Sequence, residues 1–129
     1  MRTTKIITVL NAVTAASTAS GKIYVGDATR LSLQVRRANH GSGSSTFSVK
    51  IGMESPGTVT PVMTAYNMLI DNVTNTNGQM LTRISSKVLS GDGDAFLFFD
   101  EAFKFNWIEI TGAVATDGNA SVFLLIEQE

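Results

Sequence analysis

Apolar and polar residues alternate along two short runs near the middle of the chain. Residues 31–35 and 47–51 each read apolar, polar, apolar, polar, apolar. A period of two is typical of a β-strand with one buried face. The polar, glycine-rich segment from Asn39 to Ser45 separates the two runs. Since such a segment favours a reversal of the chain, we expect the two strands to form a hairpin.

The same pattern closes the chain. The runs Lys104 to Thr111 and Ala120 to Glu127 are rich in β-branched and aromatic residues, which strands prefer. Between them lies a turn-rich segment in which Asp117 and Gly118 supply the positive backbone φ that a tight reversal needs. We therefore predict a second β-hairpin here.

Further strand candidates are separated by turn signals at fairly regular intervals, and no stretch of helical length shows an apolar stripe. These candidates are Lys22 to Val25, Thr58 to Ile70, Met80 to Leu89 and Ala95 to Phe99. About eight short strands at this spacing predict an all-β fold, namely an antiparallel β-sandwich, with a jelly roll as the expected form. The residues expected to point inward are Leu31, Leu33, Val35, Phe47, Val49, Ile51, Ile108, Ile110, Val122, Leu124 and Ile126.

One region is apolar at neighbouring positions of both parities. It contains Phe96, Leu97, Phe98, Phe99, Phe103, Phe105 and Trp107. Both faces of these strands therefore favour burial. Either they are central in a thick core, which is the simpler interpretation, or one face meets another subunit, since aromatic residues are enriched at the centres of interfaces. The possible interface residues are Ile6, Val9, Phe99, Phe103, Phe105 and Trp107.

Composition favours a subunit of a larger assembly. The 129 residues fit a single domain, residues 1–129, and include no cysteine. Only 16% of the residues are charged, with ten Lys and Arg against eleven Asp and Glu, and the mean hydropathy is slightly positive. A small chain with so little charge is expected to cover part of its surface with a partner. Because it lacks a basic face and a transmembrane span, we expect neither nucleic-acid nor membrane binding.

The amino-terminal segment has two possible interpretations. Residues 1–5 are positively charged and residues 6–16 are moderately apolar, as in a secretory signal. Thr8, Asn11 and Thr14 interrupt the apolar stretch, however. We therefore expect no cleaved signal peptide, synthesis in the host cytoplasm, and a role for residues 1–13 as a first strand or an assembly arm.

Candidate chemistry is sparse. His40 is the single histidine, and it lies in a polar loop just after Arg36 and Arg37. These three groups could hold an anion, but charged residues at a strand end more often form a solvated edge that discourages edge pairing. One histidine and no cysteine cannot build a typical zinc site.

Carboxylates offer two weaker possibilities. The segment from Asp92 to Asp94, with Asp100 and Glu101 nearby, is rich in oxygen ligands but lacks the ligand spacing of a calcium loop. Asp100, Glu101 and Glu109 are the carboxylates that glycoside hydrolysis would need, although no spacing fixes their separation. We predict no catalytic, cofactor-binding or metal-binding residue, and no enzyme.

Three segments carry a resemblance to a known class. Arg30 to Arg36, Asn106 to Ile110 and Ser121 to Ile126 lie in a short chain rich in Thr, Ser, Ala and Gly. In this respect the chain resembles small virion proteins of tailed bacteriophages, and most of all the jelly-roll capsid decoration (cement) proteins. The resemblance implies a non-enzymatic virion protein that forms a homo-oligomer, often a trimer, and binds the major capsid protein or another virion protein.

Other functions stay open at this point. One is a phage tail or fibre component, and another is the coat protein of a small RNA phage. Coat proteins of that kind resemble a β-meander followed by carboxy-terminal helices, whereas this chain ends in a strand pattern. A third is a carbohydrate-binding β-sandwich, in which Tyr24, Tyr66 or Trp107 would stack on sugar rings.

Overall fold

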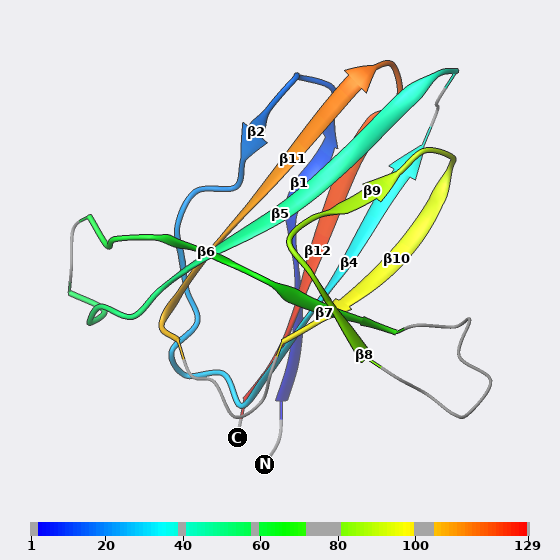
Figure 1. The fold of residues 1–129 in the computed structure, drawn as a ribbon. Coiled ribbons are helices and arrows are strands. Elements are labelled where there is room, and N and C mark those ends of the chain that lie inside the picture. The colour runs from blue at the N-terminus through cyan, green and yellow to red at the C-terminus, as the bar shows by residue number, and fades with distance from the viewer. Residues whose placement is uncertain (1–2, 39–40, 58–59, 72–80, 100–104, 129) are drawn as a thin grey trace.

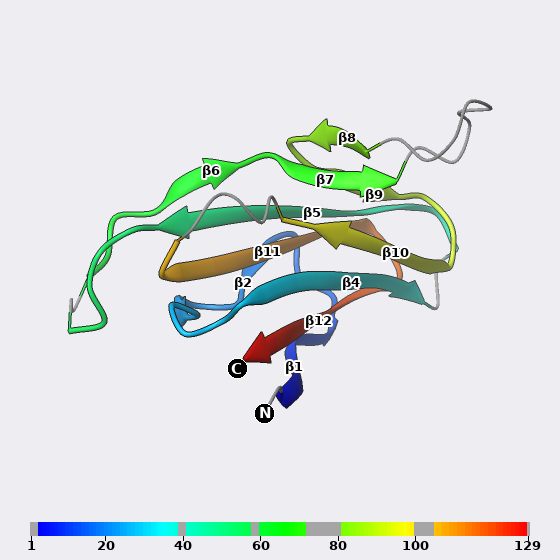
Figure 2. The ribbon, with the colours of Figure 1, turned by 90° about the horizontal axis from the view of Figure 1, so that it is seen from below.

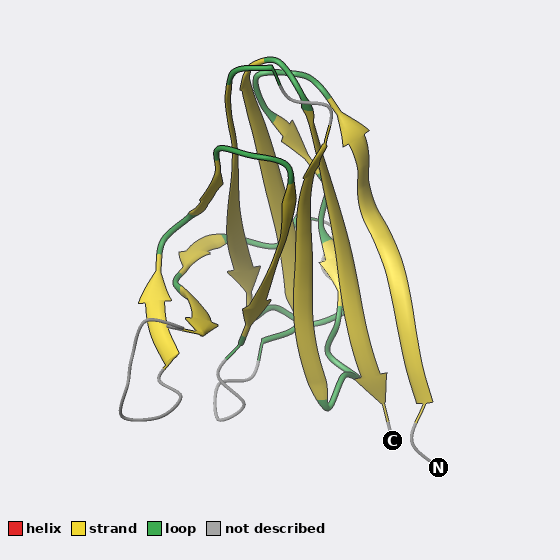
Figure 3. Cartoon of the chain, turned by 90° about the vertical axis from the view of Figure 1, so that its right-hand side faces the viewer, coloured by secondary structure: helices red, strands yellow, loops and turns green. Residues whose placement is uncertain are grey.

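The chain folds into two antiparallel sheets that pack face to face (Figures 1 and 3). The computed structural model describes residues 3–38, 41–57, 60–71, 81–99 and 105–128. Within these ranges there is no helix, and the strands are β1 (Thr3–Val13), β2 (Thr18–Ala19), β3 (Ile23–Tyr24), β4 (Arg30–Ala38), β5 (Gly43–Gly52), β6 (Thr64–Tyr66), β7 (Met68–Asp71), β8 (Leu81–Ile84), β9 (Lys87–Leu89), β10 (Gly93–Phe98), β11 (Trp107–Thr116) and β12 (Asn119–Gln128). The predicted antiparallel β-sandwich is confirmed, with twelve described strands in place of about eight.

Each sheet has six strands. In sheet A the order is β1, β12, β4, β10, β7, β8. In sheet B the long strands β11 and β5 pair at the centre, β2 and β3 pair with β11, and β6 and β9 pair with β5. Strand β1 runs antiparallel to β12, with Thr3 opposite Gln128. Figure 2 shows β1 beside β12 at one margin of the molecule, with the two chain ends next to each other.

Both predicted hairpins are wrong. Strand β4 belongs to sheet A and β5 to sheet B, and likewise β11 belongs to sheet B and β12 to sheet A. In each case the chain reverses, but it crosses from one sheet to the other, so the two strands face each other across the core. We call these two connections arches. A period of two shows that one face is buried, but both a hairpin and an arch satisfy it.

The same crossing explains why two predicted strands are split. The strand expected over residues 58–70 is β6 in sheet B followed by β7 in sheet A, with the break at Asn67. The strand expected over residues 80–89 is β8 in sheet A followed by β9 in sheet B, with the break at Ser85 and Ser86. Because β propensity continues through both breaks, the sequence pattern does not reveal that the chain changes sheet at each of them.

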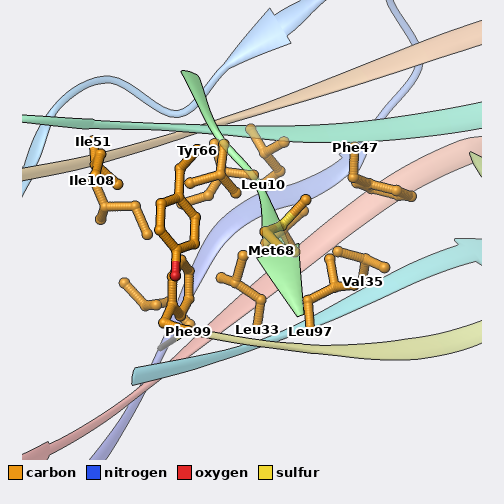
Figure 4. Close-up of a cluster of buried hydrophobic side chains, with 14 of the residues drawn as sticks. Leu10, Leu33, Val35, Phe47, Ile51, Tyr66, Met68, Leu97, Phe99 and Ile108 are labelled. Carbon is orange, nitrogen blue, oxygen red and sulfur yellow. The ribbon is translucent and has the colours of Figure 1, made fainter. Parts of the chain in front are cut away.

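The core lies between the sheets, and Figure 4 shows side chains of Leu33, Val35 and Leu97 opposite those of Phe47, Ile51 and Ile108. All the residues predicted to point inward are buried except Leu31, which is half-buried and packs against the core. Tyr66, Phe99 and Phe105 form an aromatic cluster at one side, with ring centroids 5.4 to 6.0 Å apart. These geometries are favourable for aromatic packing.

Arg37 lies at the end of the sandwich where both arches are found. It is only 1% exposed, so the expectation that Arg36 and Arg37 both form a solvated edge is wrong for Arg37. The guanidinium donates hydrogen bonds to the carbonyls of Ser42, Gly43, Leu89 and Asp117 at 2.7 to 3.1 Å. The reason is parity, because Arg37 points inward on β4 whereas its neighbour Arg36 points outward.

Candidate interaction surface

The outward side of sheet A carries apolar side chains in register across several strands. Ile6 on β1 lies opposite Leu125 on β12, and Leu125 lies opposite Ser32 on β4. Ser32 lies opposite Phe98 on β10, and Phe98 lies opposite Leu69 on β7. Since directly opposed residues in an antiparallel sheet share a face, these side chains form one row across the outside of the sheet.

A second row runs parallel to the first. Thr8 lies opposite Phe123, Phe123 opposite Gln34, and Gln34 opposite Phe96. We call the two rows together the outer apolar face; it consists of Ile6, Thr8, Ser32, Gln34, Leu69, Phe96, Phe98, Phe123 and Leu125. Phe96 is 56% exposed, Phe98 37% and Ile6 67%, so large apolar groups here meet solvent.

An ion pair between Arg36 and Asp94 lies at one end of the outer apolar face. Arg36 Nε donates to Asp94 Oδ1 at 2.9 Å, and Arg36 Nη2 donates to Asp94 Oδ2 at 3.1 Å. Gln34 Nε2 also donates to Asp94 Oδ2, at 2.6 Å. The hydrogen bond from Arg36 lowers the pKa of Asp94, and that from Gln34 lowers it further, while partial burial acts in the opposite direction. The Arg36 guanidinium lies 5.1 Å from the centre of the Phe123 ring, a cation–π contact.

The other end of the outer apolar face also carries one residue of each charge. Arg30 on β4 lies directly opposite Glu127 on β12. Arg30 is exposed and Glu127 is half-buried. Each end of the face therefore has an arginine on β4 and a carboxylate on a neighbouring strand, with apolar rows between them.

The residues predicted as a possible interface fall in different places. Ile6 lies on the outer apolar face, whereas Val9 is partly buried against the core at an irregularity in the pairing of β1. Phe99 and Phe105 are buried in the core. Trp107 is half-buried and donates from Nε1 to the carbonyl of Glu54 at 3.0 Å. Phe103 lies outside the described residues.

Sequence reasoning noted that both parities are apolar between Phe96 and Trp107 but did not separate the inward positions from the outward ones. Leu97 points inward and is fully buried, so Phe96 and Phe98 on either side of it must point outward. The alternating neighbours on β4 supply the signal that could have found them. Leu33 and Val35 are apolar and inward, and the positions that pair with Phe96 and Phe98 are Gln34 and Ser32.

A shallow cavity of about 660 Å³ lies beside β6 and is lined by residues of both sheets. Its lining includes Ile51, Met53, Glu54, Val62, Tyr66 and Arg83. Glu54 is held in place because its carboxylate accepts a hydrogen bond from the backbone of Val62 at 3.1 Å. The lining mixes apolar and polar groups without a cluster of titratable side chains that would indicate catalysis.

The chemical candidates from the sequence are not gathered into a metal site among the described residues. Among them, no group of three or more His, Cys, Asp or Glu side chains is placed to hold a metal ion. Asp94 is engaged with Arg36, and Glu109 on β11 lies opposite Lys50 on β5. His40, Asp100 and Glu101 lie outside the described ranges. Nowhere in those ranges is there a helix that could span a membrane.

No protein-family model and no curated protein matches the sequence. The fold is similar to the crystal structure of the SPBc2 prophage-derived protein YomS, with a TM-score of 0.61 and 16% identity, over 99% of this chain and 96% of that chain. At this identity the likeness shows a shared fold and nothing more. A chain from the disulfide-linked pili of Bacillus endospore appendages aligns over 99% of this chain and 86% of that chain, with 15% identity. Its TM-score of 0.40 is too low to support an argument.

Proposed function

We propose that this chain is a non-enzymatic structural protein of a phage particle, of the jelly-roll decoration class, which binds the outside of the capsid. The observation that carries the proposal is the outer apolar face of sheet A. An antiparallel sheet in a sandwich commonly buries one side and presents polar residues to water on the other. A contiguous exposed apolar area marks a surface for another protein. This chain therefore works through contact area.

The phage setting has separate support. YomS, whose fold this chain shares, is derived from a prophage. The resemblance of the sequence to small virion proteins supports the same setting. It implies that the partner is the major capsid protein and that the location is the virion. Repetition over a capsid lattice makes modest contacts of roughly 800 Å² per partner collectively strong.

The aromatic residues that a carbohydrate-binding sandwich would need are occupied within the chain. Tyr66 is buried and stacks on Phe99, with ring centroids 5.4 Å apart. Tyr24 packs edge-on against Trp107 at 5.4 Å, and the Trp107 indole N–H is bonded to Glu54. A sugar ring needs an exposed flat aromatic surface, and these contacts work against one. The capsid proposal is therefore preferred over the glycan alternative.

The experiment that tests the proposal is a quantitative mass-spectrometric analysis of gradient-purified particles from the phage or lysogen that encodes the chain. We expect the protein in a fixed ratio to the major capsid protein, in head fractions separated from tails. Its recovery in tail fractions alone would overturn the decoration role in favour of a tail or fibre component. Absence from all particles, in cells that express the protein, would overturn the virion role itself.

A further inference from the structure

We propose that strand β1 joins a second copy of this chain edge to edge, so that sheet A continues from one copy into the other. The two β1 strands run antiparallel across a two-fold axis that is perpendicular to the sheet and passes beside Ile6. The inference deepens the proposed function, on which it rests for its biological setting, by adding a partner at the margin of the surface that binds the capsid.

The two sheets end in edge strands of very different length. In sheet B the edge strands are β2 and β3 on one side and β6 and β9 on the other, and each has two or three residues. In sheet A one edge is β8, with four residues, and the other is β1, with eleven (Figure 2). Very short edge strands protect a sheet against edge-to-edge pairing, whereas a long one offers a row of backbone groups to another chain. Among the described strands, β1 is therefore the edge best suited to a further strand.

The first part of β1 is the regular part. The segment Thr3–Thr8 pairs with β12 residue for residue, and the register shifts only after Thr8. Irregularities of this kind bend an edge and discourage pairing, so the second half of β1 is protected. The segment Thr3–Thr8 contains no proline, and Lys5 is its one charged residue. This segment is therefore the part of the edge that can accept a strand.

One hydrogen bond shows which backbone groups of β12 point toward β1. The backbone N–H of Thr29, the residue directly before β4, donates to the carbonyl of Glu127 at 2.7 Å. Glu127 therefore directs its carbonyl toward the β4 side of β12. Because backbone groups alternate between the two sides of a strand, Ile126 directs its own groups toward β1, where it lies opposite Lys5. Lys5 in turn directs its N–H and C=O groups toward β12.

The residues of the other parity on β1 direct their backbone groups to the open edge. They are Thr4, Ile6 and Thr8, and no described strand pairs with them on that side. All three are exposed, and Ile6 is 67% exposed. Strand addition uses main-chain donors and acceptors of this kind.

The segment matches its own copy when Ile6 lies on the axis. Antiparallel pairing in this register places Ile6 opposite Ile6, and Thr4 of one copy opposite Thr8 of the other. Threonine pairs and pairs of β-branched residues are favourable cross-strand neighbours. Lys5 lies opposite Ile7 of the other copy, so the two lysines do not face each other directly. A closed two-fold pair requires such a self-complementary patch, and this match argues for a second copy as the occupant.

The pairing leaves the outer apolar face free for the capsid. Because the axis is perpendicular to sheet A, the outer faces of the two copies point to the same side, with the Ile6 side chains at the seam. A pair then presents two such faces at once, and linked contacts bind more tightly than single ones. The trimer expected from the resemblance rests on that resemblance alone, whereas this edge favours a pair.

The first test is the solution mass of the full chain by sedimentation velocity from about 1 to about 200 μM. We expect a dimer whose share rises with concentration. Ile6→Pro removes an N–H at the open edge and should weaken the dimer by about tenfold or more, because proline cannot donate to the new ladder. The matched control Ile6→Val keeps this N–H and a β-branched side chain, and it should dimerise as the wild type does.

Urea unfolding checks that the proline variant stays folded. Proline is tolerated in an edge strand where its missing N–H would face solvent, so the pairing of β1 with β12 should survive. If Ile6→Pro unfolds, Thr4→Pro, closer to the end of β1, serves in its place. A wild-type protein that is monomeric at the highest concentration, or a folded proline variant that dimerises as well as the wild type, would overturn the inference.

A second test addresses the register. The chain contains no cysteine, so a single cysteine can be introduced as Ile6→Cys. On the axis the two Cα atoms would lie about 5.5 Å apart, which is suitable for a disulfide. In the matched control Thr4→Cys the two cysteines would lie four residues apart along the strands, roughly 14 Å.

Under mild oxidation Ile6→Cys should therefore form a disulfide-linked dimer much faster than Thr4→Cys. Equal rates, or a faster reaction of Thr4→Cys, would overturn this register and its axis. A dimer that is absent from particles would overturn only the proposed function, and a particle-bound monomer only this inference.

Discussion

Arg37 and Asp117 are joined by a hydrogen bond of 3.0 Å from the guanidinium Nη2 to the backbone carbonyl. The Asp117 carboxylate in turn accepts hydrogen bonds from the backbone N–H groups of Gly41 and Ser42 at 2.7 and 2.8 Å. Asp117 lies in the arch between β11 and β12, and the other residues lie at or beside the arch between β4 and β5. The two crossings between the sheets are therefore fastened to each other at one end of the sandwich.

Replacement of Arg37 should be strongly destabilising. Arg37→Met removes the donor for four backbone carbonyls and leaves a hydrophobic chain that cannot satisfy them. We expect a loss of about 3–5 kcal/mol in the free energy of unfolding, as when one partner of a buried charged network is removed. Urea unfolding followed by Trp107 fluorescence measures it. The neighbouring variant Arg36→Met, at an exposed position, is the control and should change stability little; equal losses in the two variants would contradict the assignment.

The arch between β4 and β5 also depends on Gly43. Its φ is +83°, and a Cβ there would overlap the backbone carbonyl of Ala115. Gly43→Ala should therefore cost more than about 1 kcal/mol, because both the backbone conformation and the neighbouring strand oppose a side chain. Gly91→Ala, where a Cβ meets open space, is the matched control. Similar urea midpoints for the two variants would show that β5 can shift to accept the methyl group.

Sequence patterns predicted the buried positions well because alternation reports directly on which side chains face the core. Val35, Phe47, Ile110 and Leu124 were all correctly expected to point inward. The pattern failed on strand partners, because it is the same whether Asp117 and Gly118 connect neighbours within a sheet or opposite strands of two sheets. The choice between these depends on long-range pairing, such as that of β12 with both β1 and β4.

The candidate surface was predicted only in outline, for a related reason. The apolar run from Phe96 to Phe99 indicates that both faces of its strand are apolar. Which of the two faces points to solvent depends on the register in which β10 pairs with β4. Arg37 could not be recognised as buried because its stabilising groups are backbone carbonyls from three other segments, which no local pattern reveals. The charge of the Arg37 side chain favours a solvent-exposed position. Only the backbone carbonyls that the assembled arches bring together offset the cost of burying it.

The ion pair at the end of the outer apolar face should contribute a small pH dependence. Its hydrogen bonds lower the pKa of Asp94 in the folded protein. The added stability is therefore present above the ordinary carboxyl pKa of about 4 and is lost as the pH falls through the lower pKa of the folded state. We expect the stability difference between wild type and Asp94→Asn to shrink between about pH 5 and pH 2. Parallel urea titrations check this, and a difference that grows on acidification would contradict it.

Strand β1 should matter for stability as well as for assembly. Leu10 is buried in the core, so Leu10→Ala should lower the free energy of unfolding by about 2–5 kcal/mol. Deletion of residues 1–13 would remove Leu10 and the whole of β1, and loss of binding by that variant would not isolate an assembly arm. Ile6→Ala is the informative comparison, since this exposed residue of the outer apolar face should affect particle binding while leaving the urea midpoint near that of wild type. A large fall in the midpoint would place Ile6 among the structural residues instead.

The position of β12 in sheet A has a consequence for the order of folding during synthesis. It separates β1 from β4 and pairs with both, yet it is translated after every other described strand. Until residues 119–128 have left the ribosome, β1 has no partner strand and β4 lacks one of its two neighbours. Non-local pairing of this kind makes folding slow and leaves strand edges open in the nascent chain. The sandwich therefore closes late, and the edges of β1 and β4 stay open to aggregation until β12 is in place.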